Sequence, residues 1–245
     1  MKRYLFMLFM MLSCVNNNNN MVKEFYKDGS LKLEAEMDEN GLRNGFYREF
    51  YKGGELKAKT KFLKGVNIDT LYLYYKSGFL KEKGLTKKNK KNGWWSYYDS
   101  LGNLNKKNEY IFLREGIYKN QTIIYNKDKT INNGLSSYFT INLSDTLELG
   151  KNIGEINYNS NFKTDKKYLY ILIENKHSNL ETKIDTFIEE SNYSRFAIFT
   201  HQKGYKKIKG RIIEQLIFQE KINKDSAKLR IDEHEKYFEK EVYVK

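Results

Sequence analysis

The 245 residues suffice for two modest domains, and an aromatic content of 15% excludes a disordered chain. The single cysteine excludes an internal disulfide or a multi-thiolate metal site, and the three scattered histidines favour neither a metal site nor a catalytic triad. We therefore expect no cofactor, no catalytic residue and no enzyme activity. The net charge of +13 comes mostly from Lys, in a chain without Pro, and a codon-biased genome explains this composition. Proteins that recognise nucleic acids favour Arg, so we expect no nucleic-acid partner.

The chain begins with a pattern typical of an export signal. Two basic residues precede an apolar run from Tyr4 to Leu12, which is far shorter than the ~20 residues that span a bilayer but suits a signal-peptide core. The run ends at Ser13 and Cys14, and an asparagine-rich stretch follows. This arrangement resembles a bacterial lipoprotein signal, particularly the Leu-Ser-Cys form seen in the Bacteroidetes. The resemblance implies cleavage before Cys14 and acylation of Cys14.

We therefore expect residues 1–13 to be a lipoprotein signal peptide and residues 14–21 to be a flexible tether. Acyl chains contribute ~0.8 kcal/mol per buried methylene, so several of them would hold the protein on a membrane of the cell envelope. No acidic residue occurs between Cys14 and Glu24, which favours a periplasm-facing over a surface-exposed protein.

An aromatic segment with a glycine turn repeats along the next part of the chain. The repeat glycines are 25, 24 and 24 residues apart, and the fourth copy is expected to have one extra residue in its turn. A degraded fifth copy at residues 125–131 lacks the glycine. Each copy predicts an aromatic strand, a tight turn in which Gly supplies a positive φ, and a departing strand. The four glycines are Gly29, Gly54, Gly78 and Gly102.

The departing strands alternate between apolar and charged residues, as in residues 31–38 and 55–62, which predicts half-buried strands. Asn44-Gly45 and Asn92-Gly93 predict the turns between units, whereas the second unit has Ile68-Asp69 at that place. The aromatic pair, turn glycine, leucine and Asn-Gly resemble the MORN-repeat family in its bacterial variant, which includes YwqK-type antitoxins. The resemblance covers residues 22–112, and extends to 131 with the degraded fifth copy. It implies hairpins stacked into a long twisted sheet with a binding or scaffolding role, and we expect the repeat domain to span residues 22–134.

The paired aromatic residues have two interpretations. Neighbouring strand residues face opposite sides of a sheet, so one member of each pair should be buried and the other exposed. These aromatic side chains either pack the hairpins together or form an exposed row that binds a sugar, a peptide or a partner's surface. The residues considered for such a row are Tyr51, Tyr75, Trp94, Trp95, Tyr97 and Tyr98.

The repeats end before residue 135, and the remaining chain, residues 135–245, predicts a β-sandwich that resembles an immunoglobulin-like domain by pattern alone. Residues 168–173 are nearly continuous apolar sequence, as expected of a central strand with both faces covered. The strands are predicted at Tyr138–Leu143, Ile153–Tyr158, Tyr168–Glu174, Thr182–Ile188, Arg195–His201, Tyr205–Phe218, Ala227–Ile231 and Tyr237–Val244.

The patterns together predict an all-β, lipid-anchored envelope scaffold that binds an unidentified envelope protein through its repeat sheet. Two alternatives stay open. The family resemblance implies neutralisation of a toxin, and the aromatic row suggests a glycan-binding surface.

Overall fold

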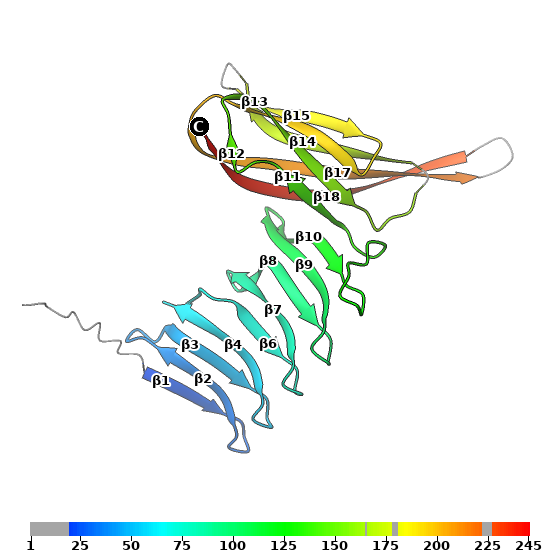
Figure 1. The fold of residues 1–245 in the computed structure, drawn as a ribbon. Coiled ribbons are helices and arrows are strands. Elements are labelled where there is room, and N and C mark those ends of the chain that lie inside the picture. Colours follow the sequence, from blue (N-terminus) through cyan, green and yellow to red (C-terminus); the bar gives the residue numbers. More distant parts are fainter. Residues whose placement is uncertain (1–19, 165, 178–180, 222–226) are drawn as a thin grey trace, which may run out of the picture.

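The computed structural model describes residues 20–164, 166–177, 181–221 and 227–245. Their fold is all-β, as predicted, with one sheet formed by the repeats and two sheets in the C-terminal domain (Figure 1). The predicted signal peptide and Cys14 lie outside the described residues. The first strand begins at Asn20, so the last two residues of the predicted tether belong to the repeat sheet.

The repeat strands follow one another across a single ten-stranded sheet, with only β5 off the main path as a partner of β4. Every strand pairing in this sheet is antiparallel, so each hairpin lies beside the next in sequence (Figure 1). The strands are β1 (Asn20–Phe25), β2 (Leu31–Met37), β3 (Arg43–Phe50), β4 (Leu56–Leu63), β5 (Val66–Asn67), β6 (Leu71–Tyr74), β7 (Leu80–Lys87), β8 (Lys90–Tyr98), β9 (Leu104–Leu113) and β10 (Gly116–Ile124).

All five predicted repeat turns share one hydrogen-bonding pattern, seen first where Tyr26 N donates to Ser30 O (2.8 Å) and Gly29 N donates to Tyr26 O (3.0 Å). The fourth turn has the same length as the others, so the predicted extra residue is wrong; Asp99 instead occupies the place of the turn tyrosine. The fifth turn keeps the geometry without glycine because Lys129 adopts a φ of 67°. The turns cover residues 26–30, 51–55, 75–79, 99–103 and 126–130.

The predicted Asn-Gly turns are wrong. Gly45 and Gly93 lie inside β3 and β8, at positive φ values of 122° and 65°, beside shifts in strand register. The chain reverses a few residues earlier, and before β8 it does so at Lys88 and Asn89, which have φ values of 51° and 59°. These left-handed residues suit a two-residue hairpin turn, so Lys-Asn supplies there what Asn-Gly was expected to supply.

One face of the repeat sheet is packed by its own side chains, and we call it the packed face. Small residues on one strand receive large side chains from the next: a Cβ on Gly84 would lie 2.5 Å from the Trp95 ring. The Trp95 indole is therefore laid over the backbone of β7, and its N–H donates to Leu85 O at 2.8 Å. The buried residues of the first nine strands are Leu33, Ala35, Ala58, Thr60, Gly84, Trp95 and Asn108.

The turn tyrosines tie neighbouring hairpins together. Each of the first three donates its hydroxyl hydrogen bond to a backbone carbonyl in the following hairpin: Tyr26 to Phe50 O (2.8 Å), Tyr51 to Tyr74 O (2.7 Å) and Tyr75 to Tyr98 O (2.9 Å). The series ends at Asp99, whose carboxylate accepts hydrogen bonds from its own turn instead. The repeat spacing thus fixes contacts between hairpins as well as within them.

The C-terminal domain has a three-stranded sheet, β11-β13-β16, and a five-stranded sheet, β12-β18-β17-β14-β15. All the predicted strands of this domain occur, but the last two are one 18-residue strand because the charged segment between them pairs with β17 throughout. The strands are β11 (Tyr138–Asn142), β12 (Thr146–Leu147), β13 (Gly150–Asn159), β14 (Lys166–Lys176), β15 (Thr182–Glu189), β16 (Tyr193–Thr200), β17 (Gly204–Lys221) and β18 (Ala227–Val244).

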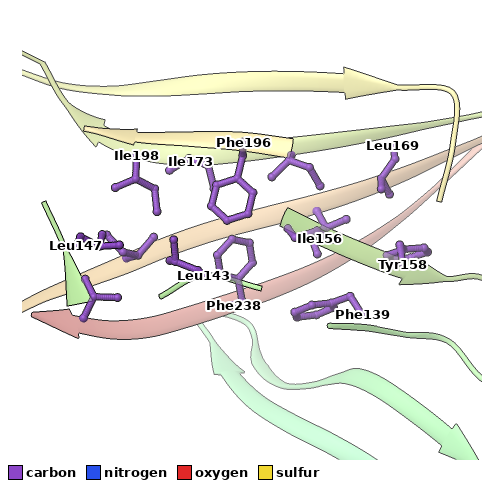
Figure 2. Packing of buried hydrophobic residues seen from close by; sticks show 14 of the residues in the cluster. Phe139, Leu143, Leu147, Ile156, Tyr158, Leu169, Ile173, Phe196, Ile198 and Phe238 are labelled. Carbon is purple, nitrogen blue, oxygen red and sulfur yellow. The ribbon is translucent and has the colours of Figure 1, made fainter. Parts of the chain in front are cut away.

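The two sheets enclose one hydrophobic core (Figure 2). Phe196 and Phe238 come from opposite sheets, with their ring centroids 6.1 Å apart. Each ring lies over a glycine: a Cβ on Gly154 would lie 2.4 Å from the Phe196 ring, and a Cβ on Gly210 would lie 2.2 Å from the Phe238 ring. Residues 168–173 do form an internal strand, but only alternate residues are fully buried, and the others are half-buried on the outer face.

The repeat sheet is fastened to the sandwich at β10 and β18. A register shift in β10 takes Asn120 out of the ladder, and its side chain forms hydrogen bonds with both Tyr237 N and Tyr237 O, each 2.8 Å long. Lys236 Nζ donates to Asn120 O at 3.0 Å, and Tyr118 Oη donates to Glu235 O at 2.6 Å. Asn120 is 1% exposed, so these bonds lie in the interior.

Candidate binding surfaces

The face of the repeat sheet opposite the packed face carries a row of cross-strand partners. In strand order from β4 to β9, the row consists of Lys59, Tyr72, Lys83, Ser96 and Lys107. Ammonium and hydroxyl groups therefore alternate along it. Neighbouring strands lie about 4.8 Å apart, so the three lysines recur about every 9.6 Å. We call this row the lysine ladder.

The lysine ladder is a positively charged strip. None of its three lysines forms an ion pair with a carboxylate of the described residues. Farther along the same face, Arg48 is paired with Glu34 at 3.1 Å, so the unpaired charge begins at β4. Lys59 Nζ lies 5.1 Å from the ring centroid of Tyr72, and a cation–π contact of this kind holds an ammonium group without neutralising it.

The two tryptophans predicted for a binding row lie on opposite faces. Trp94 is 41% exposed and shares its face with Ser96, two residues later in β8. Trp95 is 1% exposed and belongs to the packed face, so it offers no surface to a ligand. Phe46 lies on the same face as Trp94, 47% exposed, with Lys61 Nζ 4.5 Å from its ring centroid.

The four predicted tyrosines do not join Trp94 in one exposed row. Tyr51 and Tyr75 are half-buried at the turns, where their hydroxyls bond to the next hairpin. Tyr98 is half-buried at the end of β8, and its carbonyl accepts the bond from Tyr75. Tyr97 lies on the packed face opposite Glu82. With Trp95, five of the six residues considered for binding therefore have structural contacts between strands or hairpins, and only Trp94 is an exposed candidate.

Tyr97 belongs to a cation–aromatic cluster centred on Lys91. Lys91 Nζ lies 4.2 Å from the Trp95 ring centroid and 4.7 Å from that of Tyr97, and it forms an ion pair with Glu82. Burial and a hydrogen bond with Tyr110 raise the pKa of Tyr97 above its ordinary value. These groups satisfy one another, so the cluster holds β7, β8 and β9 together.

A groove of about 1240 Å³ lies between the end of the repeat sheet and the sandwich. Its apolar lining includes Phe112 and Leu113 of β9, Leu172 of β14 and Ile184 of β15, and its charged lining includes Arg114. Ile184 is 61% exposed, which is unusual for a strand residue of this size. The groove thus brings apolar and cationic side chains from both domains to one place.

A buried polar cluster lies in the sandwich beside the junction. Tyr158 Oη donates to Glu214 Oε2 at 3.2 Å, and Lys236 Nζ lies 5.7 Å from the Tyr158 ring centroid. Burial raises the pKa of Tyr158 and lowers the pKa of Lys236 to about 8. Because Lys236 also binds the carbonyl of Asn120, the cluster connects the sandwich interior to β10.

Within the described ranges, no three His, Cys, Asp or Glu side chains are grouped to hold a metal ion. The same residues include no helix with the length and apolar character needed to cross a membrane. Comparison of the chain with protein-family models, curated proteins and solved structures gives no match. The MORN resemblance and its implied roles therefore stay predictions.

The lysine ladder was not singled out from the sequence, although a signal for it exists. Lys59, Lys83 and Lys107 are spaced by 24 residues, the period of the turn glycines. In a chain with 44 basic residues this spacing is hard to see without the strand register. The groove and the junction combine segments far apart in sequence, and no local pattern marks them.

Proposed function

We propose that the chain is a lipid-anchored binding protein of the cell envelope whose repeat sheet and sandwich together hold a partner protein. The observation that carries the proposal is the groove between the domains, which offers exposed apolar and charged groups on a firmly held framework. Interfaces that bind proteins combine an apolar centre with a polar rim. Ile184 and Phe112 supply the apolar groups, and Arg114 lies among the charged ones.

The framework supports this role because little ordering is needed when a partner binds. The hydrogen bonds of Asn120 fix the two walls of the groove relative to each other. Restricting motion before binding reduces the entropy lost on association. The proposed anchor at Cys14 would keep this surface near a membrane, since acyl chains bind bilayers through their buried methylenes.

A site-specific photo-crosslinker tests the groove in the full-length protein in its native membrane. With the crosslinking residue at position 184, we expect one discrete adduct with a protein of the envelope. With the same residue at position 101, an exposed leucine in the fourth turn, we expect none. Equal adducts at both positions, or none at position 184, would contradict the groove as a partner site.

Fractionation tests the anchor separately. The wild-type protein should sediment with membranes, and the Cys14→Ser variant should not incorporate a fatty-acid label or remain membrane-bound. A Cys14→Ser variant that keeps the label would rule out acylation at this residue.

A further inference from the structure

We infer that the lysine ladder binds an extended acidic polysaccharide that carries one carboxylate on every second sugar ring. This ligand goes beyond the proposed protein partner, which uses the groove between the C-terminal end of β9 and the sandwich. Lys59, Lys83 and Lys107 point from β4, β7 and β9 to the same face, and no described carboxylate is paired with them. A net charge of +13 adds a long-range attraction for a polyanion.

The spacing of the charges matches this class of ligand. The lysines are two strands apart, which places their Cα atoms about 9.6 Å from each other along the row. Two linked pyranose rings in an extended chain cover a similar length. A polysaccharide lying across the strands would bring one carboxylate to each lysine without bending, so its stiffness would limit the entropy lost on binding.

The groups between the lysines favour a sugar over an acidic peptide. Tyr72 and Ser96 alternate with the lysines, and neither hydroxyl has a hydrogen-bond partner in the part of the chain that the structure describes. Free hydroxyls at these places suit a ligand whose uncharged rings also carry hydroxyl groups. Lys is a point charge and needs no planar two-pronged acceptor, so a single sugar carboxylate satisfies it.

Aromatic side chains orient the cations rather than stack on the ligand. Lys59 Nζ lies 5.1 Å and 5.8 Å from the ring centroids of Tyr72 and Tyr74, so these rings are engaged with the ammonium group. In the neighbouring row, Lys61 is held over Phe46 in the same manner. The recognition we infer is therefore ionic and should weaken as salt screens the charges.

Binding of hyaluronan oligosaccharides, which have one carboxylate per disaccharide, tests the inference by calorimetry on the full-length protein. We expect binding that weakens with added salt and disappears when the carboxyl groups of the probe are reduced to alcohols. Replacing all three ladder lysines with Gln should weaken binding about tenfold or more, because three modest ionic contacts are lost together. Replacing them with Arg should preserve most of it.

The matched control removes the same charge elsewhere. A triple Gln variant at the exposed turn residues Lys27, Lys76 and Lys127 should bind the probe nearly as well as the wild type. Equal losses in the two triple variants would overturn the ladder as a site, because only net charge would matter. Stronger ladder-dependent binding of polyglutamate or of phosphatidylglycerol vesicles than of hyaluronan would overturn the saccharide assignment. The crosslink at position 184 would be unaffected, so this result is separable from the partner protein.

Discussion

The connection between the repeat sheet and the sandwich depends on Asn120, and the variant Asn120→Ala should loosen it. The side-chain amide of Asn120 bonds to both backbone groups of Tyr237 and also donates to Glu109 Oε2 at 2.6 Å. All of these bonds are removed by the substitution. Glu109 keeps its bond from Gln121 Nε2 (2.8 Å), but the two backbone groups of Tyr237 lose their partner.

The expected magnitude follows from this loss. A buried backbone group left without a partner costs about 1–3 kcal/mol, so two such groups cost roughly 2–4 kcal/mol after partial relaxation. For a chain of this length, each kcal/mol lowers the melting temperature by about 2–4 °C. We therefore expect Asn120→Ala to lower the melting temperature by roughly 4–16 °C.

Thermal and urea unfolding, followed by tryptophan fluorescence and circular dichroism, measure the effect. Both tryptophans lie in the repeats, so fluorescence follows that domain, while circular dichroism follows both. For the wild type, the unfolding transitions seen by fluorescence and by circular dichroism should coincide. For Asn120→Ala, the two transitions should separate because the domains unfold independently. Asn157→Ala, at an exposed strand position, should change stability by less than about 0.5 kcal/mol. Equal stability losses in the two variants would show that Asn120 does not hold the domains together.

Three further substitutions test other contacts by urea denaturation. Tyr51→Phe removes one hydrogen bond between hairpins and should lower the free energy of unfolding by about 1 kcal/mol. Tyr205→Phe, at an 89% exposed side chain, should leave it almost unchanged. Equal effects of the two substitutions would exclude a stabilising hydrogen bond from Tyr51. Gly84→Ala places a Cβ against the Trp95 ring and should cost about 1–3 kcal/mol, and an unchanged midpoint would disprove the close packing. Lys236 has a pKa of about 8 in the fold, below the ordinary 10.5, so the free energy of unfolding should increase with pH between these two values. Lys236→Met should remove about 2 kcal/mol of the increase that the wild type shows from pH 7.5 to pH 9.5. If the variant kept the pH profile of the wild type, a buried lysine at this position would be excluded.

Local signals in the sequence sufficed for the positions of most strands and of the repeat turns, but not for the length of the fourth turn or the continuity of β18. Alternation of apolar and charged residues has the same period as a strand, and turn glycines at constant spacing place the hairpins. The fifth turn was also found, although Lys129 there takes the conformation usually left to glycine. The Asn-Gly pairs misled because positive φ serves bulges as well as turns, and Gly45 and Gly93 occupy bulges.

Contacts between distant segments could not be read from the sequence. Asn120 and Tyr237 are 117 residues apart, and an asparagine in a chain so rich in asparagine attracts no notice. Strand alternation predicts that Trp94 and Trp95 face opposite sides, but not which of them is buried. The indole of Trp95 is buried because a glycine lies in the neighbouring strand. The register between strands, rather than the residue type, decides which side chains meet.

The repeats form one continuous sheet in which Lys59 and Lys107 lie in the same row. Spin labels at these two positions, in a chain with Cys14 replaced by Ser, allow the distance to be measured by pulsed electron resonance. Four strand spacings separate the labelled residues, so we predict a narrow distribution centred at about 19 Å. A broad distribution, or a mean distance beyond about 30 Å, would contradict the continuous sheet.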